Sequence, residues 1–315
     1  MLKDKDFDTV YFSEYLKNPI SEKHKGFAQI YRDLETALKR HGYEPKLLPY
    51  KKHLVMDGFL SVWCRDYMPI HTVRRDLIDF AYTPDYLNAE KFKGHEPDSR
   101  WVCEELGIRA LDYYKDEPVF NKKHIVLDGG NIVRCGEKVI MTDKVFIENP
   151  HYKREKLTRI LEAYFDAKIV FLPWDSRECM GHADGILHCI SGNKVVMDTT
   201  GVTSSNDKDR KFANAYRKVL EENDLEVLPL DFTGIDEDAA NRWAYTNWLQ
   251  LNGLIILPSL RDTPRSNERA YELIEKYTRM SHLAIEMVDA TDLVKIGGGA
   301  LNCASWTTTK AAIKD

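Results

Sequence analysis

The feature that most constrains the fold of this chain is a repeated order of predicted elements: strand, strand, helix, strand. The clearest copy has expected strands at 125–134 and 138–142, a helix at about 151–166 and a strand at 168–173. Within the helix, apolar side chains recur at the spacing that places them on one helical face. The segment therefore predicts a compact unit in which the helix connects the second strand to the third.

Further copies of this order occupy the rest of the chain. The next two have strands at 181–190, 194–198 and 226–230 around a helix at 209–223, then strands at 244–251, 254–260 and 284–288 around a helix at 266–280. A looser copy runs from 63–72 through a helix at 98–106 to a strand at 108–112. The N-terminal segment offers a strand at 8–12, a helix at 22–41 and a strand at 44–50, which the C-terminal 297–308 could complete.

Repeats with a period of about 50–60 residues are typical of propellers, solenoids and arrays. Pairing the C-terminal segment with the first unit would close a ring and remove the exposed sheet edges. We therefore predict a five-unit, pseudo-symmetric α/β propeller with a central cavity, formed by residues 1–315 as a single catalytic domain. The alternative is an ordinary α/β sandwich in which the spacing is coincidental.

The composition excludes several classes of protein. The chain has 315 residues, of which 43% are hydrophobic and 30% charged, as in ordinary globular proteins. No stretch approaches the roughly 18 apolar residues of a membrane span, and the N-terminal sequence lacks the apolar core of a secretory signal. The net charge of -5 gives no broad basic surface for nucleic acid. We expect a cytoplasmic protein without membrane or nucleic-acid partners, and a homo-oligomer is left open.

The cysteines are sparse, and no C-x-x-C spacing of the kind found in zinc sites occurs. They stand at Cys64, Cys103, Cys135, Cys179, Cys189 and Cys303. We expect reduced thiols, as in cytoplasmic proteins, with one of them a nucleophile. No metal site and no cofactor are predicted.

Polar residues recur in one slot of the repeat, at the start of each unit's first predicted strand. They are Asp66, Asp128, His182 with Asp184, Asn247 and Cys303. In a ring, equivalent ends of the units converge on the axis, so these residues would share one cavity. Three carboxylates suit a planar cation with forked N–H donors, a thiolate is a nucleophile, and histidine transfers protons near neutral pH.

Each of these residues has an ordinary structural explanation when taken alone. An aspartate before a turn is usually a cap, a DGG sequence is a common turn, and a lone cysteine is more often buried than reactive. His182 and Asp184 on one strand face could equally be a surface or metal pair. Their occurrence at one position in successive units is what favours a shared site.

The motifs WCRDYMP, LDGGN, GHADG, AYTN and GGGALNC, in this order, resemble those of the guanidine-modifying enzymes. They are most similar to the group of agmatine deiminases and bacterial-type peptidylarginine deiminases. The resemblance extends from about residue 60 to the C-terminus and implies the same five-unit fold. It also implies hydrolysis of a guanidino group to a ureido group and ammonia, without metal or organic cofactor. The implied substrate is a small cationic guanidino compound or an arginine side chain.

The resemblance implies a role for each matching residue. Asp66 and Asp184 would hold the guanidinium, and Cys303 would attack its central carbon to form an amidino-thioether. His182 would protonate the departing ammonia and then activate water. Asp128, in the place of a family glutamate, would support the histidine and the substrate, and Asn247 would orient a neighbouring group.

The chain departs from the agmatine-type pattern at three more places. Ala300 and Asn302 replace an asparagine and a histidine before the cysteine, and Met68 replaces a glycine. If 300–303 were a strand, the side chains of 300 and 302 would face away from Cys303, or toward the pocket rim if the strand is bulged. Met68 is expected to reshape the pocket wall, and agmatine is expected to be a poor substrate.

Other functions would use the same residues. An amidinotransferase would share the core and use an amine in place of water. A guanidinium-binding protein without activity would need neither Cys303 nor His182. A cysteine protease would need an oxyanion hole and one group orienting the histidine, rather than several carboxylates near the thiol.

Overall fold

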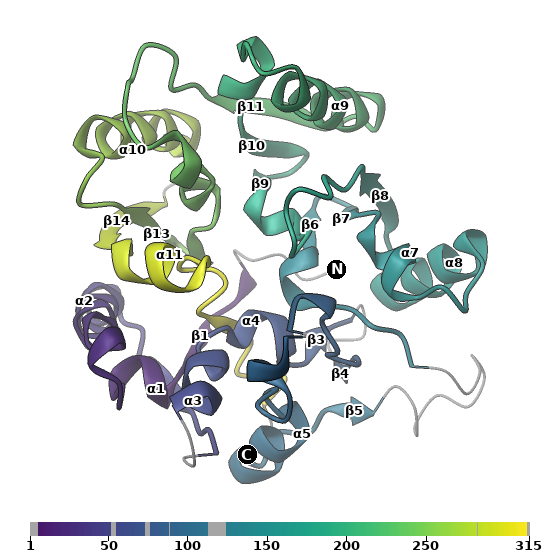
Figure 1. Cartoon of the computed structure of the whole chain (residues 1–315), viewed down its shortest axis with the longest axis vertical. Coiled ribbons are helices and arrows are strands. Elements are labelled where there is room, and N and C mark those ends of the chain that lie inside the picture. The colour runs from purple at the N-terminus through teal and green to yellow at the C-terminus, as the bar shows by residue number, and fades with distance from the viewer. Residues whose placement is uncertain are drawn as a thin grey trace.

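The computed structural model describes residues 6–51, 55–72, 76–87, 89–112, 124–281 and 283–313. Five three-stranded sheets are arranged in a ring, and the longer helices lie on the outside (Figure 1). In every sheet, the middle strand pairs antiparallel with the first strand and parallel with the third. The predicted five-unit fold is therefore confirmed.

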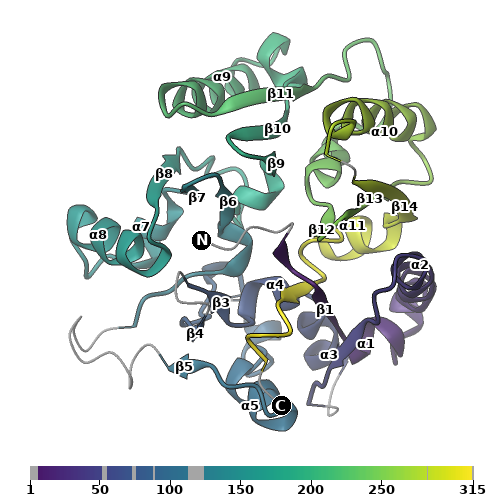
Figure 2. The ribbon, with the colours of Figure 1, turned by 180° about the vertical axis from the view of Figure 1, so that it is seen from behind.

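The C-terminal strand closes the ring as predicted. β15 (Trp306–Thr308) pairs antiparallel with β1 (Thr9–Ser13), which pairs in parallel with β2 (Lys46–Leu48). Figure 2 shows the yellow C-terminal segment beside the purple β1. The helices of this unit are α1 (Glu14–Lys17), η2 (Glu22–His24) and α2 (Gly26–Arg40).

The other four units follow in chain order. The second contains α3 (Val55–Ser61), α4 (Cys64–Tyr67), β3 (Ile70–His71), β4 (Leu77–Asp79), η3 (Asp85–Leu87), η4 (Glu90–Phe92), α5 (Ser99–Leu106) and β5 (Leu111–Asp112). The third contains η6 (Gly129–Asn131), β6 (Val133–Cys135), β7 (Lys138–Thr142), α7 (Lys144–Glu148), α8 (Arg154–Phe165) and β8 (Lys168–Leu172). The fourth contains η7 (Ala183–Gly185), β9 (Leu187–Ser191), β10 (Lys194–Asp198), η8 (Thr200–Thr203), α9 (Asp207–Glu222) and β11 (Glu226–Leu230). The fifth contains η9 (Ala239–Thr246), β12 (Leu249–Leu251), β13 (Leu254–Ser259), α10 (Pro264–Thr278), β14 (Ala284–Asp289) and α11 (Thr291–Gly297).

The hydrophobic core lies between the sheets and their covering helices and continues from one unit to the next. In α8, buried side chains at helical spacing pack against β4 and β7, which belong to two different sheets. A second cluster joins β6 to the strands of the fourth unit, and a third joins β1 and α2 to the fifth. Because neighbouring units share apolar clusters, the ring presents its inner turns in fixed positions.

The expected strands at 125–134, 181–190 and 244–251 were too long. Only their last few residues form β6, β9 and β12, and the residues just before these strands form the tight turns η6, η7 and η9. These turns satisfy their own backbone, as in the Asn131 N–H bond to the Asp128 carbonyl. Such hydrogen bonds compete with strand pairing, and the alternating pattern of the sequence does not reveal them.

The expectation that all six cysteines are reduced was wrong for two of them. Cys135 at the end of β6 and Cys189 in β9 form a disulfide, with 5.4 Å between their Cα atoms. The adjacent sheets bring these residues together across 54 positions of sequence, which spacing alone could not reveal. Cys64, Cys103, Cys179 and Cys303 are free.

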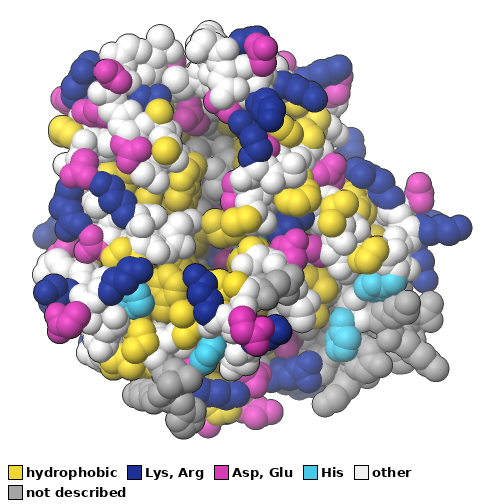
Figure 3. Space-filling view, viewed as in Figure 1, with side chains coloured by type: hydrophobic (Ala, Val, Ile, Leu, Met, Phe, Trp, Pro, Cys, Tyr) yellow, Lys and Arg dark blue, Asp and Glu magenta, His cyan; other side chains and the backbone are white. Residues whose placement is uncertain are grey.

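No helix in the described ranges combines the length and the apolar character needed to cross a membrane. On the face of the ring seen in Figure 3, hydrophobic side chains border the hollow near the middle.

Candidate active site

Turns from the different units converge at the centre of the ring, each placed directly before the first strand of its sheet. Asp66 lies in α4, Asp128 precedes η6, and Asp184 lies in η7 directly after His182 and Ala183. Asn247 ends η9, and Cys303 follows α11. The turns α4, η6, η7 and η9 contact one another in sequence around the centre. The structure therefore brings together all six predicted site residues.

His182 is held between two carboxylates. Its Nε2 is 3.0 Å from Asp128 Oδ2 and its Nδ1 is 3.5 Å from Asp66 Oδ1. Burial alone would lower the pKa of the imidazole, but the Asp66 and Asp128 carboxylates outweigh it and raise the pKa to about 10. At neutral pH the ring is consequently a buried imidazolium, which can act as an acid.

Asp66 and Asp184 are both buried in the same group of charges. Burial raises the pKa of Asp66 to about 7, and the neighbouring Asp128 and Asp184 add to the increase against the effect of His182. Burial also raises the pKa of Asp184, with His182 opposing it. With three carboxylates around one imidazolium, the group has room for one more positive charge.

Gly130 allows this close approach. Its N–H donates to Asp66 Oδ1 at 3.1 Å. A Cβ atom at this position would lie 2.5 Å from His182 Nδ1 and 2.6 Å from Asp66 Oδ1, closer than such contacts allow. The GG sequence, which alone could be an ordinary turn, is thus needed for the packing of the site.

Cys303 is hydrogen-bonded directly to Asn247 and to Asp184, and Asn302 bonds the same aspartate. Its N–H donates to Asn247 Oδ1 at 3.1 Å, and its thiol donates to Asp184 Oδ2 at 3.7 Å. Asn302 donates to the same Asp184 oxygen at 2.7 Å. Burial raises the pKa of the Cys303 thiol well above its usual value, and the charges of Asp184 and Asp66 raise it further. In the free protein this residue is therefore a thiol.

Two expectations about the departures from the family pattern were wrong. Asn302 does not face away from the site, because 300–303 is a turn rather than a strand and its amide reaches Asp184. Met68 is buried in an apolar cluster with Trp306 and is not among the described residues that line the central cavity. Ala300 is fully buried.

A cavity of about 400 Å³ opens above these groups. We use "floor" for five titratable residues of the site turns: His182, Asp184 and Cys303, which line the cavity, and Asp66 and Asp128, which contact His182. We use "wall" for five of the apolar side chains that line the cavity above them: Trp174, Met180, Ile186, Tyr216 and Trp243. Two acidic residues, Asp175 and Glu178, also line it. This shape suits a ligand with a cationic head and an apolar shaft.

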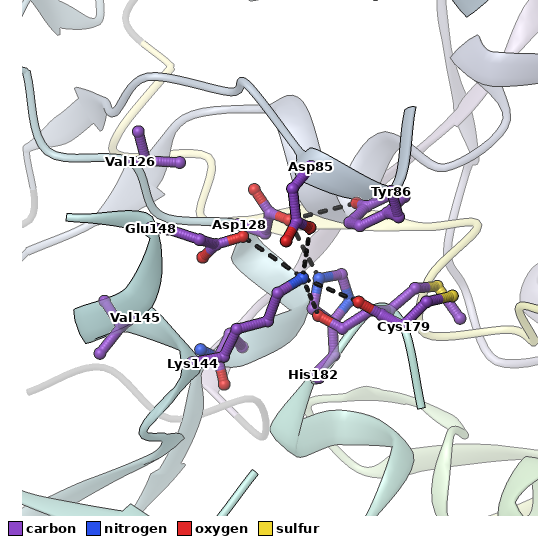
Figure 4. A network of polar contacts seen from close by, with 12 residues as sticks. Asp85, Tyr86, Val126, Asp128, Lys144, Val145, Glu148, Cys179 and His182 are labelled. Atoms are coloured by element: carbon purple, nitrogen blue, oxygen red, sulfur yellow. Dashed lines mark hydrogen bonds and ion pairs between the residues drawn. The ribbon is translucent and has the colours of Figure 1, made fainter. Parts of the chain in front are cut away.

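Two residues that the sequence did not single out contact the floor or its supports. The Tyr86 hydroxyl donates to Asp128 Oδ2 at 3.1 Å, the oxygen that also contacts His182 (Figure 4). Lys144 lies directly behind these groups and is 1% exposed in its side chain. Neither belongs to a motif, and the sequence would predict a tyrosine or lysine in a polar segment to lie at the surface. No local signal could have identified them.

Across the described ranges, no three His, Cys, Asp or Glu side chains are arranged to hold a metal ion.

Comparisons with known proteins agree with this arrangement. The model of the Porphyromonas-type peptidyl-arginine deiminase family matches residues 30–308. The agmatine deiminase of Pseudomonas putida is 25% identical over 233 residues, which cover 64% of this chain and 61% of that protein. The chain spans about 60% of the length of the curated relatives it matches.

Solved structures share the fold at low identity. The agmatine deiminase of C. jejuni superposes with a TM-score of 0.72 at 16% identity, covering 98% of this chain and 95% of that one. DDAH from Pseudomonas aeruginosa superposes with a TM-score of 0.55 at 15% identity, covering 96% and 99%. These likenesses extend over nearly the whole chain and support the assignment of the fold.

Proposed function

Because this chain belongs to the Porphyromonas-type peptidyl-arginine deiminase family, we propose that it is a cysteine-dependent hydrolase of guanidino groups. One observation carries the proposal: the Cys303 thiol donates to Asp184, 3.7 Å away, beside an imidazolium held by two more carboxylates. A nucleophile, an acid and a place for a planar cation thus lie on one cavity floor. The whole chain would act as one catalytic domain.

The charges of the floor favour binding of a guanidinium. Forked N–H donors pair well with carboxylates, and Asp184 and Asp66 are the two carboxylates whose charges act on the Cys303 thiol. A cation bound between them would offset the like charges that raise the pKa of Cys303. Binding of the substrate would therefore favour loss of the thiol proton to solvent, which leaves a thiolate next to the carbon to be attacked.

The reaction would then proceed in two halves. The Cys303 sulfur forms a bond to the central guanidinium carbon, and the resulting tetrahedral species expels one nitrogen as ammonia, which takes its proton from His182. The product of this half is an amidino-thioether. His182, now neutral, accepts a proton from a water that attacks the same carbon. The carbon–sulfur bond then breaks, the hydroxyl proton passes to the departing sulfur, and the ureido product leaves with Cys303 again a thiol.

Supporting roles follow from the contacts. Asp128 would hold the imidazole in place through Nε2, and Asn247 would fix the backbone of the nucleophile through its bond to the Cys303 N–H. An amidinotransferase would use the same first half, with an amine in place of water. A protein that only binds a guanidinium would need neither the thiol nor the imidazolium.

The substrate, partners and location go beyond the family assignment. Agmatine, arginine derivatives and peptidyl arginine share the guanidinium head, and the protein is proposed to act on one of these classes. The cytoplasmic location stays a prediction, and the Cys135–Cys189 disulfide is more typical of oxidising compartments.

The proposal is tested by measuring ammonia release from a panel of guanidino compounds, including arginine in a peptide, with no amine added. We expect release from at least one compound. Release only after an amine is added would favour the transferase. A haloacetamidine probe with mass-spectrometric mapping should label Cys303; failure to label it in folded protein, with no ammonia from any compound, would leave a binding protein.

A further inference from the structure

Lys144 carries a positive charge into the protein interior next to the floor. Its ammonium donates to Asp85 Oδ1 at 2.7 Å and to the backbone carbonyls of Cys179 at 2.8 Å and Met180 at 3.0 Å. Glu148, one turn along α7, is 3.4 Å away. Figure 4 shows these groups converging on the ammonium from three separate segments. Every one of its donors can thus be accounted for without solvent.

One arm of this arrangement leads to Asp128. Asp85 is followed by Tyr86, whose hydroxyl donates to Asp128 Oδ2 and whose ring lies edge-on to His182, with 5.9 Å between the ring centres. The Lys144 ammonium is also 5.1 Å from the centre of the Tyr86 ring, a cation–π distance. Lys144 therefore holds Tyr86 through its neighbour and through its ring.

The other arm leads to His182. The carbonyls of Cys179 and Met180 come from the turn that directly precedes Gly181 and His182. Gly181 adopts a φ of +65°, and a Cβ there would lie 2.7 Å from Lys144 Cδ. The lysine stem therefore fits against the backbone that presents the imidazole.

We propose that Lys144 is a positioning residue that fixes the hydrogen bond between Asp128 and His182 by tethering two segments: the turn that leads into His182, and η3, whose Tyr86 donates to Asp128. This rests on the proposed function, in which His182 transfers the protons. Stability alone is a poor explanation for the lysine, because a well-packed apolar side chain usually stabilises a protein interior at least as well as a buried ion pair. The ammonium instead fixes the relative positions of the segments it bonds, because it bonds only where carbonyl and carboxylate oxygens converge.

The test compares Lys144→Met, which keeps the length of the side chain and removes the charge, with Lys39→Met. Lys39 forms an exposed pair with Glu35 on α2, far from the cavity floor in sequence and in the ring. Two quantities are measured: kcat for the best guanidino substrate, and the side-chain ¹⁵N NMR signals of His182, assigned with His182→Gln.

Lys144→Met should lower kcat by about 100-fold, the loss that a displacement of roughly 1 Å produces at a catalytic group. It should also shift the His182 Nε2 signal away from that of the hydrogen-bonded imidazolium. Lys39→Met should change neither. Tyr86→Phe should have a smaller effect on kcat, and the double variant should lose little more than Lys144→Met alone, because both act on the same pair.

An unchanged His182 spectrum in folded Lys144→Met would overturn the proposal, whatever happens to the melting temperature. If Lys144→Met does not fold, Asp85→Asn decides, since the Asp85 side chain is 47% exposed and tolerates the change. It should shift the same signal and lower kcat by no more than about fivefold. The NMR readout needs no turnover, so it distinguishes this proposal from a failure of the proposed reaction.

Discussion

The floor and the wall of the cavity differ in how their residues depend on one another. On the floor, burial and neighbouring charges together set the pKa of each group: burial, with the nearby carboxylates, raises the pKa of Asp66 to about 7, and the carboxylates outweigh burial to raise the pKa of His182 to about 10. The wall is made of aromatic and aliphatic side chains that contribute surface. Single changes on the floor should therefore alter the chemistry, whereas changes on the wall should alter the choice of substrate.

The largest effect should come from the nucleophile. Cys303→Ser should lower kcat by at least about 10³-fold, because a hydroxyl is not activated by the cation that favours the thiolate. Circular dichroism and the melting temperature should remain close to those of the unaltered protein. The exposed Cys179→Ser is the matched control on the wall side and should keep full activity. Activity of Cys303→Ser within tenfold of the parent would remove the residue from the reaction.

The second-largest effect should come from Asp66 and Asp184, the two carboxylates proposed to hold the guanidinium. Asp66 is charged above pH of about 7 and His182 is protonated below about 10, so kcat/KM should rise through pH 7 and fall near 10. Asp66→Asn should lower kcat/KM by roughly 10²- to 10³-fold through loss of a charged, bidentate bond in a shielded site. Its acid limb should lose the ionisation near pH 7 that Asp66 contributes.

Initial rates of ammonia release between pH 5.5 and 10.5 check this for Asp66→Asn and Asp184→Asn. Both variants should be impaired to a similar degree. If either keeps the kcat/KM of the parent, that residue does not hold the guanidinium.

The residues of the floor could be predicted from the sequence because they recur at one position of the repeat. The order of elements was enough for the ring, and the ring was enough to bring Asp66, Asp128, His182, Asp184, Asn247 and Cys303 to one centre. The direction of Asn302 was predicted wrongly because a turn was mistaken for a strand, and one residue of difference in local geometry reverses a side chain.

The supports behind the floor follow no local pattern. Lys144 and its partner Asp85 are 59 positions apart, and a lysine in the first turn of a short helix usually faces solvent. Cys135 and Cys189 meet only because adjacent sheets are neighbours in the closed ring. Contacts of this kind depend on the packing of whole units and become visible only in three dimensions.

The smallest effect concerns the wall and a second charge on the substrate. The two acids that line the cavity are already engaged: Asp175 binds Arg177, and Glu178 accepts the N–H groups of Met180 and Gly181. The face of Trp174 is 5.6 Å from the Lys144 ammonium, so a further cation there would meet a like charge. Among the described residues that line the cavity above the floor, a distal ammonium therefore finds the apolar wall and two carboxylates, Asp175 and Glu178, that already accept hydrogen bonds.

We accordingly expect agmatine, which carries such an ammonium, to be at least about 100-fold poorer in kcat/KM than the best substrate, a difference of roughly 2.7 kcal/mol in transition-state binding. The matched comparison is pentylguanidine, in which a methyl group replaces the ammonium and the head group is unchanged. It should exceed agmatine, and Trp243→Ala should reduce this advantage by lowering the apolar contact of the shaft while leaving kcat for short guanidines almost unchanged. If agmatine proves the best compound of the panel, Asp175 and Glu178 do not decide the choice of substrate, and the departures at Asn302 and Met68 have no effect on it.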